Sequence, residues 1–384
     1  MGCNLHNGIT EARSENAEFE EKLEISKSSF SRKLYINGVS SISAQSDDIL
    51  VVEEPKYFQQ NIFSAQDIAY KQYIKPMMLR RMSKAIKMGL VTAKNALMEA
   101  GVRVPDAIIV GTGEGCKQDT EKFLENILDG QESFLTPTAF IQSTHNTVGG
   151  QIALDLKCTG YNMTYTQNSA SFESALLDAI LQFNEDRTIR SVLVGGVDEL
   201  AKTSTPFYYL DGQLKKEAIP NLELLESETS GTITSEGANF FLLSKLRTKN
   251  SYASILDCAL FNSISESKLP DTIKSFLKRN DLSISEIDAI VLGNNGDVRF
   301  DKYYKKLQEG IFSNTLQLGF KHLVGDYNTA TAYAFWLSAN IIKENRIPDF
   351  IKINSETKPD SIKNMLIYNQ YLGKNHSLTL VQSL

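Results

Sequence analysis

The chain has 384 residues, of which 42% are hydrophobic and 22% charged, and its formal net charge is −6. This balance is typical of a folded globular protein and excludes a disordered or fibrous chain. The length lies near the upper limit for one compact core, so we expect two sub-domains or one large two-part fold. The acidic balance argues against nucleic acid as the main partner.

No window of the sequence approaches eighteen uninterrupted apolar residues, so we expect no membrane-spanning helix and no membrane association. Cys3, Cys116, Cys158 and Cys258 lie far apart, without the spacing of a zinc site or a disulfide framework. We therefore expect no metal, and a cytoplasmic location. The first residues lack the features of a secretory signal, and His6 stands where a myristoylation motif requires Ser or Thr.

In chain order, residues 1–32 are rich in Glu and poor in large apolar side chains, which predicts an acidic, flexible extension. The folded region begins at about Lys33. A β-rich segment from Leu34 follows, interrupted by Gly38, and residues 76–100 have the apolar spacing of a helix. Short apolar segments predict further strands at 106–111, 191–196, 237–243, 252–258 and 288–293. Residues 205–232 show few landmarks and predict a surface loop.

One segment of the chain repeats. Asp-Ala-Ile-Ile-Val-Gly at 106–111 recurs as Asp-Ala-Ile-Val-Leu-Gly at 288–293, and each copy follows a helix-like segment. Buried parallel strands resemble one another in any case, so the repeat alone is compatible with chance as well as duplication. We expect two similar halves, 33–245 and 246–384, in a layered α/β fold.

Several motifs, read together and in this order, resemble the β-ketoacyl synthase family of the thiolase-like fold. They are residues 136–153 with 165–176, Val-Gly-Gly-Val-Asp-Glu at 194–199, Ser-Glu-Gly-Ala at 235–238, Lys-His-Leu-Val-Gly-Asp-Tyr-Asn-Thr-Ala at 321–330 and Leu-Gly-Lys-Asn at 372–375. The resemblance runs from about Leu34 to the C-terminus. It implies a five-layered α-β-α-β-α fold of two duplicated halves.

The resemblance also indicates which positions to inspect for catalysis. In the family, a cysteine at the start of a helix accepts the acyl chain, and two histidines bind the donor thioester carbonyl. Here the cysteine position falls on Ser169, the first histidine position on Asn294, with an alignment that could also reach Gly293, and the second on Asp326. Lys321 is retained. For Ser169 the alternative to a nucleophile is a helix cap.

A carboxylate at position 326 opposes the family's chemistry. Two like charges about 4 Å apart repel by about 4 kcal/mol at an effective dielectric of about 20, which would penalise a forming enolate about a thousandfold in rate. Asp326 could avoid this effect by taking up a proton or by pairing with Lys321.

The resemblance implies two further sites. Tyr371, Gly373 and Asn375 fall in the family's glycine-rich gate loop, where Leu372 replaces a glycine and should stiffen the loop. Between Asp67 and Glu99 the charged residues are all basic, so this stretch could steer an acidic partner or form an ordinary solvated helix face. In the family this region, here Arg80, Arg81 and Lys84, docks acyl carrier protein, whose phosphopantetheine arm delivers the chain; no bound cofactor is implied.

The leading functional hypothesis is a catalytically degenerate ketosynthase of the chain-length-factor type. It would pair with an active β-ketoacyl synthase in fatty acid or polyketide biosynthesis, for example of aryl polyene or flexirubin-like products. One alternative is an acyltransferase that uses Ser169, and another is a homodimeric acyl-binding protein. Because family members dimerise across strands near the nucleophile, we expect a homodimer or a heterodimer.

Overall fold

The computed structural model describes residues 33–130, 137–354 and 359–384. Residues Leu34–Leu384 form one compact unit. The extension predicted for residues 1–32 lies outside the described residues. Because the unit is not divided further, the boundary predicted at residue 245 stays a prediction.

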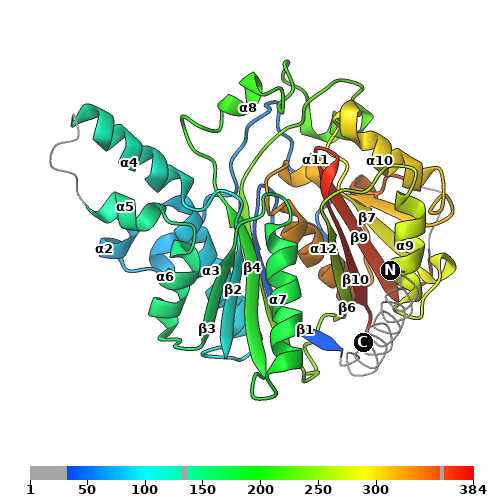
Figure 1. Ribbon diagram of the computed structural model, residues 1–384, viewed down its shortest axis with the longest axis horizontal. Coiled ribbons are helices and arrows are strands. Elements are labelled where there is room, and N and C mark those ends of the chain that lie inside the picture. The colour runs from blue at the N-terminus through cyan, green and yellow to red at the C-terminus, as the bar shows by residue number, and fades with distance from the viewer. Residues whose placement is uncertain (1–32, 131–136, 355–358) are drawn as a thin grey trace, which may run out of the picture. The chain divides into compact units, whose positions relative to one another are not determined.

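Ten strands form one sheet in the order β3-β2-β4-β5-β1-β6-β10-β9-β7-β8 (Figure 1). The first five along the chain are β1 (Leu34–Ile42), β2 (Ala107–Gly111), β3 (Tyr161–Tyr165), β4 (Ser191–Asp198) and β5 (Gly237–Ser244). The other five are β6 (Ser254–Phe261), β7 (Ala289–Leu292), β8 (Leu316–Gly319), β9 (Asn364–Tyr371) and β10 (Lys374–Gln382). All five predicted strands after the first are therefore present.

The two halves of the sheet have the same connectivity. In the first half β2 pairs in parallel with β3 and β4, while β5 is antiparallel to β4 and β1. In the second half β7 pairs in parallel with β8 and β9, while β10 is antiparallel to β9 and β6. The repeated sequence motif forms the equivalent strands β2 and β7. The prediction of a duplicated α/β fold is thus confirmed.

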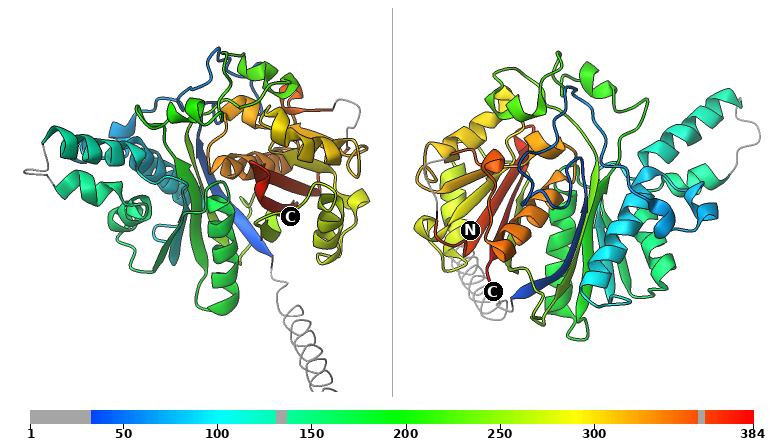
Figure 2. Two further views of the ribbon diagram at one scale, coloured as in Figure 1. Left: turned by 45° about the horizontal axis from the view of Figure 1, so that its top comes forward. Right: turned by 180° about the vertical axis from the view of Figure 1, so that it is seen from behind.

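The helices complete the layers. They are α2 (Pro76–Leu79), α3 (Lys84–Glu99), α4 (Lys117–Asp129), α5 (Pro137–Ser143), α6 (Thr147–Leu156), α7 (Ser171–Glu185), α8 (Phe207–Leu210), α9 (Leu269–Lys278), α10 (Val298–Gln308), α11 (Lys321–Val324) and α12 (Ala330–Glu344). Short 3-10 turns lie at Tyr70–Gln72, Asn221–Glu226, Ile284–Glu286 and Asp349–Ile351. Helices α4 and α5 extend away from the sheet on the side of α2 and α6 (Figures 1 and 2).

Alternating strand residues build three apolar layers. Ile109 of β2 and Val291 of β7 face the central core around α7 and α12, whereas Ile108 packs with α3 and α6 and Ile290 with α9 and α10. Both faces of each half-sheet are thus covered by helices, as buried parallel strands require. This gives the five layers that the resemblance implied.

Three local expectations need correction. The first strand is not interrupted at Gly38: it continues through a register shift between Ile36 and Gly38. Position 38 requires glycine, because a Cβ atom there would meet the Ala96 carbonyl of α3 at 2.1 Å. The helix predicted for residues 76–100 is two helices, α2 and α3. The segment 205–232 is more than a surface loop, since Leu214, Lys215 and Leu224 are buried.

The described helices include none that is both long and apolar enough to cross a membrane. The described residues also contain no group of three or more His, Cys, Asp or Glu side chains placed to hold a metal ion.

Candidate functional site

The turn from β3 into α7 carries the predicted nucleophile position. Asn168 has φ of 48°, a left-handed backbone that few residues other than glycine adopt, although asparagine tolerates it best. Sharp, strained strand-to-helix turns present nucleophiles in other enzymes. In this chain the strained and exposed residue is Asn168, whereas the adjacent Ser169 is 4% exposed. Sequence reasoning missed Asn168, and its tolerance of this backbone was the available signal.

The structure does not support a capping role for Ser169. The hydroxyl of Ser169 is buried and has no hydrogen-bond partner among the described residues. Ser171 fastens the turn instead: its hydroxyl accepts from the Gln167 amide at 2.8 Å and donates to the Asn168 carbonyl at 2.6 Å. The helix-cap alternative for Ser169 is therefore wrong, and none of the described residues brings a general base into hydrogen-bonding contact with its hydroxyl.

Lys321 and Asp326 meet at the second histidine position. The Lys321 ammonium lies 2.8 Å from Oδ1 of Asp326, and both side chains are largely buried. Gly325 makes the connecting turn with φ of 72°, where a side chain would meet the backbone nitrogen of Ser235 at 2.7 Å. The pairing considered for Asp326 is therefore present.

Asn295, rather than the predicted Asn294, completes this contact. The Asn295 amide donates to Oδ2 of Asp326 at 2.7 Å. The Asn294 side chain is also buried, but its Oδ1 has no hydrogen-bond partner among the described residues. Both residues follow β7. The alignment reached only Asn294 or Gly293, so Asn295 was not among the predicted positions.

Two further buried carboxyl groups interact with the Lys321 charge. Burial raises the pKa of Glu173 on α7. A 2.8 Å hydrogen bond from Ser377 and the charge of Lys321 act in the opposite direction and lower this pKa. Burial raises the pKa of Asp301 to about 6, although it accepts from the backbone amides of Asn295 and Gly296. The centre therefore holds one lysine among three carboxyl groups, and sequence reasoning missed Glu173 and Asp301.

The predicted gate loop is a tight hairpin between β9 and β10. Leu372 and Gly373 both have positive φ, 50° and 72°, as a two-residue type I′ turn requires. The Tyr371 hydroxyl donates to Gln213 at 2.7 Å, and burial raises the pKa of Tyr371 to about 12. Asn375 instead donates its backbone amide to Asn262 after β6, at 2.9 Å. The structure brings Tyr371, but not Asn375, to the pocket described next.

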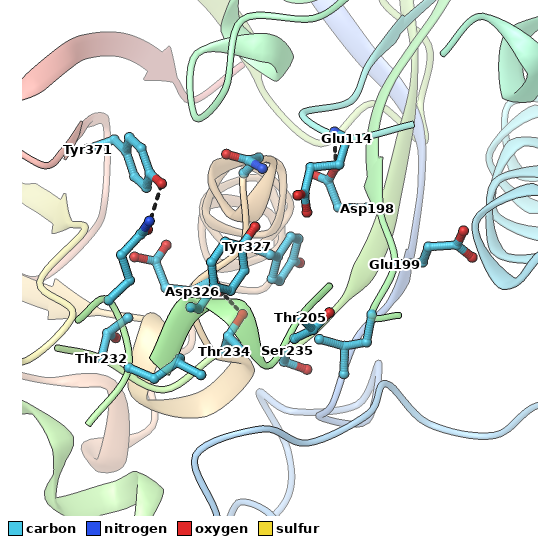
Figure 3. Close-up of a pocket in the computed structure, with 15 residues that line it drawn as sticks. Glu114, Asp198, Glu199, Thr205, Thr232, Thr234, Ser235, Asp326, Tyr327 and Tyr371 are labelled. Atoms are coloured by element: carbon cyan, nitrogen blue, oxygen red, sulfur yellow. Dashed lines mark hydrogen bonds between the residues drawn. The ribbon is translucent and has the colours of Figure 1, made fainter. Parts of the chain in front are cut away.

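A pocket that is open to solvent lies beside this centre (Figure 3). Its lining includes Asp326 and Tyr371 but not Ser169, Asn294 or Lys321. The remaining lining comes from three regions: Glu114, Asp198, Glu199 and Leu200; Thr205, Tyr208, Gln213 and Leu214; and Thr232, Thr234, Ser235, Tyr327 and Asn328. The segment predicted as a surface loop therefore forms one of its walls.

Asp198, the last residue of β4, and Glu199, which follows it, bind four segments around the pocket. Asp198 accepts from the amide and hydroxyl of Thr329 at 2.8 Å each and from the amide of Gly113 at 2.8 Å. Glu199 points away from Asp326 and Tyr371 (Figure 3) and accepts from Ala85 and Gln118, in the first turns of α3 and α4. Burial raises the pKa of Asp198 to about 6 and that of Glu199 to about 8.

Lys215 fastens the pocket wall to the loop that carries Asn295. Its ammonium donates to Ser227 Oγ at 2.6 Å, to the carbonyl and hydroxyl of Thr229 at 2.9 and 3.0 Å, and to the Gly296 carbonyl at 2.6 Å. The side chain is 1% exposed, and burial lowers its pKa to about 8. Gly296 directly follows Asn295, so this contact helps to place the Asp326 partner.

The three predicted docking residues differ in environment. Arg80 and Arg81, between α2 and α3, are exposed. Lys84 forms an ion pair with Glu236, whose side chain is 1% exposed. Of these three residues, only Lys84 takes part in this internal ion pair.

Comparison with known proteins agrees with the fold. Residues 56–210 match the family profile of the β-ketoacyl synthase N-terminal domain. No curated protein matches the sequence. Among solved structures, the ishigamide ketosynthase/chain length factor is 16% identical with a TM-score of 0.76, over 92% of this chain and 99% of that one. A β-ketoacyl synthase from Burkholderia phymatum STM815 is 14% identical with a TM-score of 0.76, over 92% and 100%.

A third similar structure is the ketosynthase ApeO in complex with its chain length factor ApeC from Xenorhabdus doucetiae, at 15% identity and a TM-score of 0.71, over 92% of this chain and 98% of that one. The fold is therefore the thiolase-like fold of ketosynthases. The predicted resemblance to the β-ketoacyl synthase family is confirmed by the sequence profile over residues 56–210, and the solved structures agree in fold.

Proposed function

We propose that this chain is a non-condensing, ketosynthase-like subunit that pairs with an active β-ketoacyl synthase, as a chain length factor does. The observation that carries the proposal is the Lys321–Asp326 ion pair. An ionised carboxylate only accepts hydrogen bonds, and both Asp326 oxygens are already bonded, to Lys321 and Asn295. The Asp326 side chain therefore offers a thioester carbonyl no donor, in contrast to the histidine of the family.

The thiols support the same proposal. Cys116 and Cys258 are buried in the core, and burial raises the pKa of both thiols. Cys158 donates to the Pro105 carbonyl at 3.3 Å. No cysteine stands in the turn at residues 166–170, so this turn offers no thiolate to accept an acyl chain.

The edge strand of the sheet supports a binding position for the partner. β3 is an end strand that pairs only with β2 in the described part of the chain, and Met163 on it is 40% exposed. We place the ketosynthase partner along β3 and acyl carrier protein near Arg80 and Arg81, with the phosphopantetheine arm carrying the chain. The proposed pathway is polyketide or fatty acid biosynthesis, since the similar solved structures include a ketosynthase with its chain length factor.

The test is a condensation and decarboxylation assay with malonyl-loaded acyl carrier protein. It is run on this chain alone, on a candidate active ketosynthase alone, and on the mixture. Product only in the mixture, abolished by mutating the partner's cysteine but unaffected by Ser169→Ala, is the expected result. Turnover by this chain alone would refute the proposal.

A substitution on β3 tests the proposed pairing with the ketosynthase. Met163→Arg on β3 should prevent co-purification with the ketosynthase, whereas Met98→Arg near the end of α3, at a methionine that is 74% exposed, should not. If the chain stays a homodimer in the presence of the candidate partner, the homodimeric acyl-binding alternative gains support.

The acyltransferase alternative keeps a separate test. It requires a base at Ser169, and the described residues place none in hydrogen-bonding contact with its hydroxyl. Intact-mass analysis after incubation with acyl-loaded carrier protein would reveal a covalent adduct. An adduct that Ser169→Ala removes would favour this alternative over the non-condensing subunit.

A further inference from the structure

The outer face of helix α10 carries a group of basic side chains. The helix buries Tyr304 and Leu307 in the core of the second half of the sheet. Its four basic residues are all exposed: Arg299, Lys302, Lys305 and Lys306. Because successive turns of the helix bring residues three or four positions apart onto one face, these four side chains share the outer face. A chain with a net charge of −6 therefore concentrates positive charge there.

The three lysines of this face are not neutralised within the described chain. Arg299 forms an ion pair with Asp297 at 2.6 Å. None of the ion pairs among the described residues includes Lys302, Lys305 or Lys306. Exposed positive charge that no neighbouring carboxylate cancels attracts an acidic partner and accelerates its association.

An exposed apolar surface adjoins the basic face. Helix α8 exposes Phe207, Tyr209 and Leu210, the last to 85%. The Arg299 guanidinium donates to the carbonyl of Gly212 at 2.7 Å, two residues beyond the end of α8, so α8 and α10 border on one another along the upper edge of the molecule (Figure 1). We call these three apolar residues and the four basic residues of α10 the α8–α10 surface. An apolar patch with a charged rim is typical of a protein–protein interface.

Helix α10 lies away from the edge strand proposed for the ketosynthase partner. The ring of Tyr304 on α10 packs against that of Tyr368 on β9, with 5.4 Å between the ring centres. In the strand order, β9 and its neighbour β7 lie in the half of the sheet that does not contain β3. A partner bound along β3 would therefore leave the outer face of α10 uncovered.

We propose that the α8–α10 surface is a second docking surface for the acidic acyl carrier protein, besides the one around Arg80 and Arg81. The inference rests on the proposed function, which supplies the carrier protein as partner. A protein fits better than a membrane or a nucleic acid, because the basic residues span only about 10 Å of helix and the chain as a whole is negatively charged. A carrier protein held here raises the effective concentration of carrier beside the pair.

The experiment measures the binding of fluorescently labelled acyl carrier protein to the full chain by fluorescence anisotropy. The salt concentration is about 150 mM, where exposed charges more than about 8 Å apart are largely screened. The starting variant is Arg80→Glu/Arg81→Glu, which removes the first docking surface and should still bind. Adding Lys302→Glu/Lys305→Glu/Lys306→Glu should weaken this binding at least about tenfold. If the triple reversal does not fold, the three corresponding glutamine substitutions take its place.

Matched controls separate local from general effects. Arg187→Glu/Arg247→Glu/Lys249→Glu changes the net charge equally, at exposed residues of the loops before β4 and after β5, and should weaken binding by less than about threefold. Leu210→Asp on α8 should weaken binding severalfold, because it places a carboxylate in the apolar part of the surface. Met98→Asp, at a residue of α3 that is 74% exposed, should not.

The two proposals fail separately. Loss of all carrier binding in Arg80→Glu/Arg81→Glu, or equal binding with and without the three reversals on α10, would overturn the inference and leave the proposed function intact. Binding to phosphatidylglycerol vesicles but not to carrier protein would also overturn it, in favour of a membrane surface. Condensation by this chain alone, together with carrier binding that depends on α10, would refute only the proposed function.

Discussion

The ammonium group of Lys321 lies 2.8 Å from the carboxylate of Asp326, and the side chains of the two residues are only 2% and 11% exposed. Breaking a buried ion pair by removing one partner leaves an uncompensated charge, which costs about 3–5 kcal/mol. An exposed pair contributes about 0–1 kcal/mol. Lys321 and Asp326 should therefore behave as a stability element as well as part of the site.

Lys321→Met tests this relationship. We expect the free energy of unfolding, measured by urea titration at pH 7.5, to fall by about 3 kcal/mol or more. Lys274→Met removes the exposed pair with Asp271 and should change it by less than about 1 kcal/mol. The double variant Lys321→Met/Asp326→Leu should recover much of the loss. Similar small effects of both single variants would contradict a buried pair.

Lys215→Met tests the clamp between the pocket wall and the Asn295 loop. The variant leaves two carbonyl and two hydroxyl oxygens without their shared donor, so we expect a loss of about 2–4 kcal/mol in unfolding free energy. Hydrogen exchange should accelerate in peptides covering 227–231 and 293–297. Lys216→Met changes the adjacent, exposed lysine and serves as the matched control. Unchanged exchange in both peptides would argue against the clamp.

Leu372 occupies a left-handed position in the β9–β10 turn, with φ of 50°. A left-handed backbone costs a residue such as leucine about 1–2 kcal/mol, and Asn-Gly is the preferred pair for this turn. Leu372→Asn should therefore raise the unfolding free energy by about 1 kcal/mol. Leu246→Asn, at an exposed leucine that has no positive φ, should not stabilise the protein. A loss of stability in Leu372→Asn would mean that packing of the leucine outweighs backbone strain.

Glu199 should make stability depend on pH. Burial raises its pKa to about 8 in the folded chain, above the ordinary value of 4.5, so between these values the folded state binds more protons than the unfolded state. The contribution of Glu199 to stability is thus greatest below the unfolded pKa and falls as pH rises to about 8. For one titrating group, a difference of one unit between the folded and unfolded pKa corresponds to about 1.4 kcal/mol of stability.

Urea midpoints measured from pH 5 to 8.5 provide the check. Glu199→Gln has the shape and neutral charge of the protonated carboxyl group, so its stability should be close to that of the wild type near pH 5 and should decline less as the pH rises. Glu286→Gln, at an exposed cap whose pKa is lowered by Ser283, should leave the slope over this range unchanged. A wild-type curve without a decline would refute the assignment.

Much of the fold could be predicted from the sequence because it depends on local patterns. Short apolar segments marked β2, β4, β5, β6 and β7, and the repeat placed β2 and β7 as equivalents. The break between α2 and α3 and the bulge at Gly38 could not be read this way. Both depend on packing, for instance on the approach of Ala96 to Gly38.

The candidate site was predictable only where a motif kept its neighbours in sequence, as in the segment from Lys321 to Asp326. That motif identified Lys321 and Asp326. Their pairing was one of two outcomes considered, and protonation of Asp326 was the other. Asn295, Glu173 and Asp301 were missed because no periodicity marks them. Their roles follow from contacts with segments far along the chain, such as Ser377 on Glu173.

The sequence by itself determined the duplicated α/β fold and the absence of cysteine and histidine from the expected catalytic positions, since both follow from residue identity and local hydrophobic spacing. Only the tertiary structure decided that Asp326 is bonded on both oxygens, that Lys215 joins two loops and that the pocket has acidic walls without a basic side chain. These features depend on side-chain distances between segments separated by tens to hundreds of residues, which only the packing of the layers brings together.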